Sequence, residues 1–140
     1  MPKEAVLGNG NLVVCMDRYG YLRDLYYPYV GQENHIQGHR HKLGVFVDGK
    51  FSWLDSDEWS ISIDYKSESL VAEITAINPA LKLEIVMEDA VVYNLNANIK
   101  KIIVKNLSAH KRDVKFFINQ HFHISEANIG DTTYFQPEEK

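Results

Sequence analysis

The 140-residue chain has the composition of a globular domain, since 45% of its residues are hydrophobic and 24% are charged. Its net charge of −4, from 15 basic and 19 acidic residues, offers no attraction to a phosphate backbone, so we expect no nucleic-acid partner. No apolar run approaches the roughly 20 residues that cross a membrane, so we expect no membrane partner either.

The beginning of the chain predicts a cytoplasmic protein. The segment MPKEAVLGNG lacks the uninterrupted apolar stretch of a signal peptide. The single cysteine, Cys15, cannot form an internal disulfide, so nothing requires an oxidising compartment. Because Cys15 lies in the apolar run NLVVCMD, we predict a small buried hydrophobic residue there rather than a nucleophile.

A polar and aromatic loop is predicted after the first strands. The stretch YYPYVGQENHIQGHRH, from Tyr26 to His41, combines tyrosines, histidines, an acid and an amide without the period of a helix or a strand. Adjacent residues of an extended segment point to opposite faces, so one core cannot bury all of its tyrosines.

The rest of the chain alternates with a period of two, which predicts strands. The alternation is clearest at 60–65, 81–88 and 114–124. Asp48-Gly49 predicts a hairpin turn, because both central residues of a type I′ turn need positive φ. Asn78-Pro79 predicts the end of a strand, since proline lacks an amide donor.

These patterns predict an all-β fold, an antiparallel β-sandwich of about eight or nine strands. The last ten residues, DTTYFQPEEK, predict the beginning of a further strand pair. A sandwich without its later strands has open sheet edges. We therefore expect either self-association through these edges or a chain that is the first part of a larger super-β-sandwich.

The histidines raise the question of a metal site. His35, His39 and His41 have an H-x3-H-x-H spacing, and His121 and His123, two apart in a predicted strand, could both reach one zinc ion. Alternatively, all four histidines of the H-x-H pairs are ordinary solvent-facing strand residues. Neither spacing includes the paired cysteines or the HExxH context of a specific zinc motif, so we predict no metal and no cofactor.

The chain contains several carboxylates that could act as a catalytic acid and base. Their sequence contexts do not distinguish them from ordinary acidic residues in turns. Glycoside hydrolysis requires two carboxyl groups on either side of the scissile bond. None of the chain's acids lies in a context that separates it from a solvated turn acid, so we predict no catalytic pair, and no catalytic residue, in this chain. The acids considered are Asp24, Glu33, Asp55, Asp57, Glu58, Glu126 and Asp131.

The loop and its surroundings resemble a known family. The stretch LGNGNLVVCMDRYGYLRDLYYPYVGQENHIQGHRHKLGVFVDGKFSWL is similar to the N-terminal region of prokaryotic glycoside hydrolase family fifteen, and the resemblance continues through ALKLEIVMEDAVV, IIVKNLS, FFINQHFHIS and GDTTYFQPE. That family includes glucoamylases, glucodextranases and archaeal trehalases. The resemblance implies that residues 1–140 form all or part of an N-terminal β-sandwich domain, and that two catalytic glutamates lie in an (α/α)6 barrel absent from this chain.

The resemblance also implies a role for the loop. We expect it to contact the helical barrel of an inverting α-glucosidase and to reach the rim of its pocket for α-glucan or trehalose. Two alternatives remain: a self-contained Ω-like loop on a structural scaffold, and a stand-alone carbohydrate-binding module that uses its tyrosines. The interdomain or substrate-rim candidates are Tyr26, Tyr27, Tyr29, Gln32, Glu33, Asn34, His35, His39 and His41.

Overall fold

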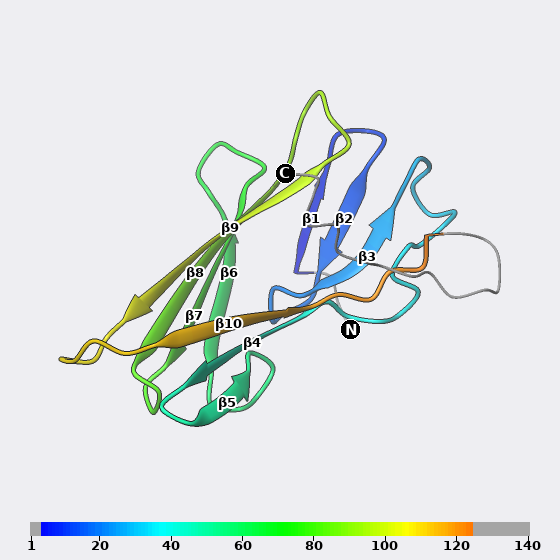
Figure 1. The fold of residues 1–140 in the computed structure, drawn as a ribbon. Coiled ribbons are helices and arrows are strands. Elements are labelled where there is room, and N and C mark those ends of the chain that lie inside the picture. The colour runs from blue at the N-terminus through cyan, green and yellow to red at the C-terminus, as the bar shows by residue number, and fades with distance from the viewer. Residues whose placement is uncertain (1–3, 125–140) are drawn as a thin grey trace, which may run out of the picture.

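The computed structural model describes residues 4–124, which form ten antiparallel strands joined by turns and loops (Figure 1). The prediction of an all-β fold is confirmed, with slightly more strands than expected. None of residues 4–124 forms a helix of the length and apolarity needed to cross a membrane. The strands are β1 (Ala5–Gly8), β2 (Val13–Met16), β3 (Leu22–Tyr26), β4 (Lys42–Val47), β5 (Lys50–Trp53), β6 (Ser60–Tyr65), β7 (Ala72–Asn78), β8 (Leu83–Val91), β9 (Asn98–Asn106) and β10 (Val114–Asn119).

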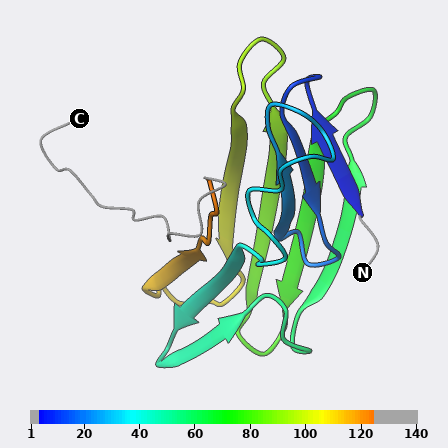
Figure 2. The same cartoon turned by 90° about the vertical axis from the view of Figure 1, so that its right-hand side faces the viewer.

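The strands form three sheets with the orders β1-β2-β3, β10-β4-β5 and β6-β7-β8-β9. The β1-β2-β3 sheet lies over the four-stranded sheet, and β1 contacts both β6 and β8 (Figure 2). The Tyr65 hydroxyl of β6 joins the layers, because it donates to Val6 O (2.9 Å) and accepts from Val6 N (2.7 Å). The core lies between the layers, as expected for a sandwich.

Strand β8 shows how the sequence pattern produces this core. Leu83, Ile85 and Met87 are completely buried, whereas Glu84 and Glu88 point outward. Glu84 pairs with Lys105 of β9 (2.6 Å), so the outer face carries ion pairs across the strands. The predicted alternation at 81–88 is therefore confirmed.

The two predicted turns are also confirmed. Asp48 and Gly49 have φ values of 51° and 76° and join β4 to β5, as a type I′ turn requires. Strand β7 ends at Asn78, whose side-chain oxygen accepts a hydrogen bond from Leu81 N (2.8 Å) before β8 begins.

The prediction of one strand from 114 to 124 is wrong at its end, because β10 stops at Asn119. Asn119 pairs with Lys42, the first residue of β4, so the following residues have no strand residue opposite them. They run instead along the Tyr26–His41 loop, where His123 N donates to His35 O (2.7 Å). The predicted strand pair at 131–140, with Glu126 and Asp131, lies outside the described residues.

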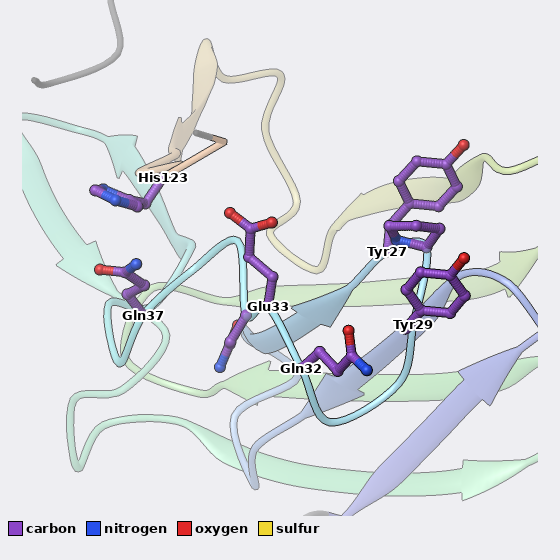
Figure 3. A pocket seen from close by; sticks show the side chains of 8 residues that line it. Tyr27, Tyr29, Gln32, Glu33, Gln37 and His123 are labelled. Carbon is purple, nitrogen blue, oxygen red and sulfur yellow. The ribbon is translucent and has the colours of Figure 1, made fainter. Parts of the chain in front are cut away.

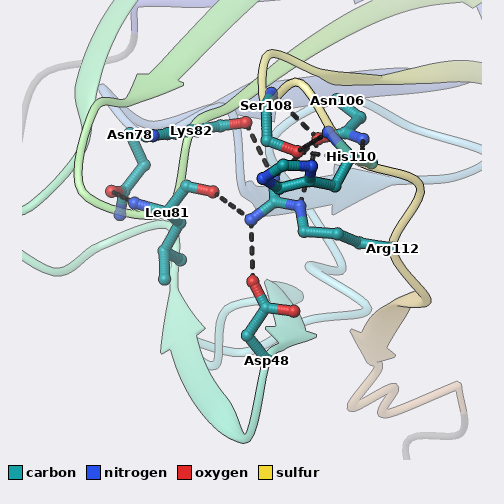
Figure 4. Close-up of polar contacts among 8 residues, drawn as sticks. All are labelled: Asp48, Asn78, Leu81, Lys82, Asn106, Ser108, His110 and Arg112. Carbon is teal, nitrogen blue, oxygen red and sulfur yellow. Dashed lines mark hydrogen bonds and ion pairs between the residues drawn. The ribbon is translucent and has the colours of Figure 1, made fainter.

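The loop between β9 and β10 is held by one arginine (Figure 4). The Arg112 guanidinium donates to the carbonyl oxygens of Leu81 (2.9 Å) and Lys82 (3.0 Å) in the β7–β8 turn. It also contacts Asp48 in the β4–β5 turn (2.9 Å) and the Asn106 side-chain oxygen (2.8 Å). Arg112 thus holds together the β4–β5 turn, the β7–β8 turn and the β9–β10 loop at one end of the sandwich.

Candidate functional site

The Tyr26–His41 loop begins where β3 ends and returns to the same strand. Isolated bridges join Tyr26 to Asn34 and Leu22 to His41, so both ends of the loop are tied to β3. Asn34 organises the turn: its side-chain oxygen accepts from the amides of Leu25 and Ile36 (both 3.1 Å). Its amide nitrogen donates to Asp24 Oδ1 (2.8 Å).

The inner side of the loop packs into the domain. Ile36 is completely buried and His35 is 8% exposed. The His35 ring contacts the carbonyl oxygens of Tyr27 through Nε2 (2.8 Å) and of His123 through Nδ1 (3.2 Å). These contacts fix the loop against the segment that follows β10.

Two further histidine contacts join the same segments. The His39 ring stacks on His121 with centroids 3.7 Å apart. His41 is 4% exposed, its Nε2 donates to His121 O (3.1 Å), and its ring meets Phe122 edge-on at 4.5 Å. We call the five residues His35, His39, His41, His121 and His123 the histidine clasp.

The clasp changes the interpretation of these histidines. The alternative that His41 faces solvent is wrong, because the 120–124 segment covers it. His121 and His123 do not share a strand face, since β10 has already ended. Within residues 4–124, no three His, Cys, Asp or Glu side chains converge in a way that could hold a metal ion.

The clasp predicts a pH dependence of stability. Burial lowers the pKa of His41, and the neighbouring charge of His121 lowers it further, although the hydrogen bond to the His121 carbonyl opposes this. Between the usual histidine pKa and the lower pKa of folded His41, the unfolded chain binds a proton at this residue and the folded chain does not. The free energy of unfolding therefore decreases as the pH falls through this range.

We therefore expect urea denaturation to show lower stability at about pH 5.5 than at about pH 7.5. His41→Gln should reduce this difference, because glutamine can still donate to His121 O but does not titrate. Other ionisable side chains also lie near His41, namely His39, His121 and Lys100. The matched control is His110→Gln, which removes a histidine at an exposed position. An unchanged pH difference in His41→Gln would contradict the assignment.

The outer side of the loop lines an open depression of about 820 Å³. Figure 3 shows Tyr27 and Tyr29 on one side, His123 and Gln37 on the other, and the Glu33 side chain between them. Tyr29 is 65% exposed and Tyr27 is 42% exposed. The lining residues are Tyr27, Pro28, Tyr29, Gln32, Glu33, Asn34, Gln37 and His123.

The structure thus separates the predicted site residues into two groups. Tyr27, Tyr29, Gln32, Glu33 and Asn34 line the depression. The other predicted residues, Tyr26, His35, His39 and His41, are placed in the strand end or the clasp and are absent from its lining.

Sequence reasoning missed three lining residues, namely Gln37, His123 and Pro28, the last of which lies between two predicted tyrosines. Gln37 and Gly38 both have positive φ (48° and 84°), and this Gln-Gly turn was the local signal for the first. No local signal identifies His123, since it comes from a segment 82 or more residues further along the chain than the loop.

The depression is lined by tyrosines, amide side chains, a histidine and a carboxylate. Its described lining contains one carboxylate, Glu33, whose Oε1 is buried without a hydrogen bond and lies 4.0 Å from His35 Nδ1. Tyrosine faces, amide groups and one carboxylate can contact a neutral polar surface. Acid and base catalysis of glycoside hydrolysis would need a second carboxyl group.

Comparison with known proteins connects the chain to glycosyl hydrolases. Over 130 residues, 93% of this chain, it is 28% identical to an uncharacterized glycosyl hydrolase of Methanocaldococcus jannaschii. The chain spans 20% of the length of that protein. No family model matches the chain, and no solved structure matches it. The sequence is therefore similar to one region of a much longer protein with a glycosyl hydrolase name.

Proposed function

We propose that the chain is the non-catalytic N-terminal domain of an inverting α-glucosidase of the glucoamylase type, in glycoside hydrolase family fifteen. The similarity to one fifth of a protein named as a glycosyl hydrolase supports this proposal. The proposal also agrees with the depression, which is lined by one carboxylate among the residues that the structure describes. The catalytic pair then belongs to the remainder of the parent enzyme.

The observation that carries the proposed contact is the exposure of the loop's outer tyrosines. The inner side is held by buried Ile36 and by the histidine clasp, so the loop presents Tyr27 and Tyr29 outward from a buried base. Tyrosine is enriched in interfaces because it combines a large apolar ring with a polar tip. We propose that the catalytic barrel covers this side, and that Glu33 and Gln32 reach the rim of its substrate pocket.

We expect Tyr29→Ala and Glu33→Ala, introduced into the full-length parent enzyme, to lower kcat/KM on maltooligosaccharides or trehalose by about tenfold, or to lower the melting temperature. This magnitude corresponds to the loss of roughly 1 to 2 kcal/mol at a central interface contact. Leu70→Ala, at an exposed position between β6 and β7, is the matched control. Unchanged activity together with unchanged melting would contradict the proposed contact.

A stand-alone carbohydrate-binding module is the second candidate, and the same exposed tyrosines favour it. It predicts that the isolated chain binds maltose or trehalose in calorimetry, and that Tyr27→Ala or Tyr29→Ala abolishes the binding. Binding that is lost in Tyr29→Ala, without any effect of the same variant on the parent enzyme, would favour this candidate over the interface.

A further inference from the structure

A second hollow lies between the two layers of the sandwich, beside β9, which is the last strand of the four-stranded sheet among the described residues. It consists of an outer cavity of about 600 Å³ and an inner cavity of about 170 Å³. Both are lined by Leu22, Asn98 and Gln120, so they adjoin, and we call them together the interlayer cleft. The outer volume lies within the range of about 300 to 1,000 Å³ that is typical of small-molecule sites.

Two extended segments form the walls of the cleft. Asn98, Lys100 and Ile102 point into it from β9, each two residues from the next. Residues 118–124 contribute every second side chain from the opposite side, namely Ile118, Gln120, Phe122 and Ile124. The outer part adds the apolar side chains of Leu12, Leu22 and Leu25, so a ligand there would meet mainly hydrocarbon.

The inner cavity contains a buried acceptor without a partner. His41 lines it and is 4% exposed. Its Nε2 donates to His121 O, which places the proton of the neutral ring on Nε2 and leaves Nδ1 as an acceptor. Nδ1 is buried and has no hydrogen-bond partner. A group in this cavity that lies within reach of Nδ1 satisfies it only by supplying a donor.

The charged groups of the cleft do not favour an anion, and the outer cavity already contains the carboxylate of Glu33. Lys100 is the cation of the inner cavity, and its Nζ is already bound to the buried carboxylate of Asp89. Asp89 Oδ1, beside this pair, is a second buried acceptor without a partner. An anion would gain little from a neutralised lysine and would bring no donor. An uncharged hydroxyl compound brings donors at no electrostatic cost.

We propose that the interlayer cleft binds an uncharged sugar, with one hydroxyl donating to His41 Nδ1 and the C–H face of the ring against Leu22 and Phe122. A pyranose combines apolar faces with hydroxyl edges, and this matches apolar walls that end at polar groups. The amides of Asn98 and Gln120 lie where the two cavities join, and Gln120 offers both a donor and an acceptor to further hydroxyls, whereas Asn98 Nδ2 already donates to Ala90 O (3.2 Å). The outer cavity shares Tyr27 and Glu33 with the depression on the loop, but the residues that carry this proposal, Leu22, His41, Gln120 and Phe122, do not line that depression.

Calorimetric titration of the 140-residue chain with maltose and glucose tests the proposal, with glycerol and succinate as comparison compounds. We expect the sugars to bind and succinate not to bind. His41→Gln should weaken maltose binding by about tenfold or more, because the glutamine amide can keep the donor to His121 O while its acceptor oxygen no longer lies at the position of Nδ1. His110→Gln is the matched control, since His110 lies on the exposed β9–β10 connection.

A second variant covers the case in which His41→Gln fails to fold. Ile102→Phe, at a partly buried position of β9, fills the inner cavity from its wall and should abolish binding while the circular dichroism spectrum stays that of a β protein. Absence of sugar binding to the folded wild-type chain would overturn the proposal. Binding of succinate, or a dimer through β9 that excludes the sugars, would also overturn it. None of these results depends on the activity of the parent enzyme. That activity is the test of the proposed contact between the loop and the catalytic barrel.

Discussion

Lys100→Met is expected to lower the free energy of unfolding by about 3 to 5 kcal/mol at neutral pH, because it leaves a buried carboxylate without its counter-charge. Asp89 on β8 is completely buried and lies directly opposite Lys100 on β9. Burial raises the pKa of Asp89 even though Lys100 lowers it, which shows how costly the ionised form already is at this position. Removing the lysine takes away the main group that opposes the burial.

The loss of stability in Lys100→Met should decrease as the pH falls. The folded-state pKa of Asp89 lies above that of the unfolded chain, so the folded protein takes up a proton first and gains stability as the pH falls through the folded pKa. Urea denaturation at about pH 7.5 and about pH 5 checks this, with the wild type measured at both values. An equal loss at both pH values would contradict a buried ionised Asp89.

Two companion variants separate charge from packing. The double variant Lys100→Met/Asp89→Leu should recover most of the loss, because replacing a buried ion pair with apolar groups is often neutral. Lys101→Met is the matched control, since the Lys101 side chain is 62% exposed and pairs with Glu88 on the outer face. It should leave stability close to that of the wild type.

Arg112→Ala is expected to lower the free energy of unfolding by about 2 to 4 kcal/mol, because several charge-assisted hydrogen bonds are lost together. The Arg112 side chain is 11% exposed, and its guanidinium satisfies the carbonyl oxygens of Leu81 and Lys82. Those oxygens lie in the turn before β8, the strand that supplies Leu83 to the core. Loss of the arginine should therefore also increase hydrogen exchange in this turn.

Two control variants accompany Arg112→Ala: a substitution at the neighbouring residue and the conservative substitution of the arginine itself. Lys111→Ala, at an exposed position, should have little effect on the urea midpoint. Arg112→Lys should recover only part of the stability, because one ammonium group cannot reach all the acceptors of a planar guanidinium. Full recovery by lysine would mean that charge, rather than the forked geometry, holds the three connections together.

Much of the fold follows from local patterns. The alternation in β8 and the turn at Asp48-Gly49 depend on the geometry of one strand and on positive φ at two residues. Such features involve neighbours in the chain, so the sequence by itself determines them. The same holds for the end of β7 at Asn78, before a proline that cannot donate to a sheet.

The candidate site depended on the tertiary structure. A loop without a period does not show which of its residues turn inward, and the distinction between buried His41 and exposed Tyr29 arises only when the 120–124 segment packs against the loop. That segment loses its strand character because β4 begins at Lys42 and offers no partner beyond Asn119. These contacts join residues about 80 positions apart, and pairing over such separations leaves no local trace in a sequence. The sequence therefore determined the strands and the composition of the loop, whereas long-range packing decided what the loop presents.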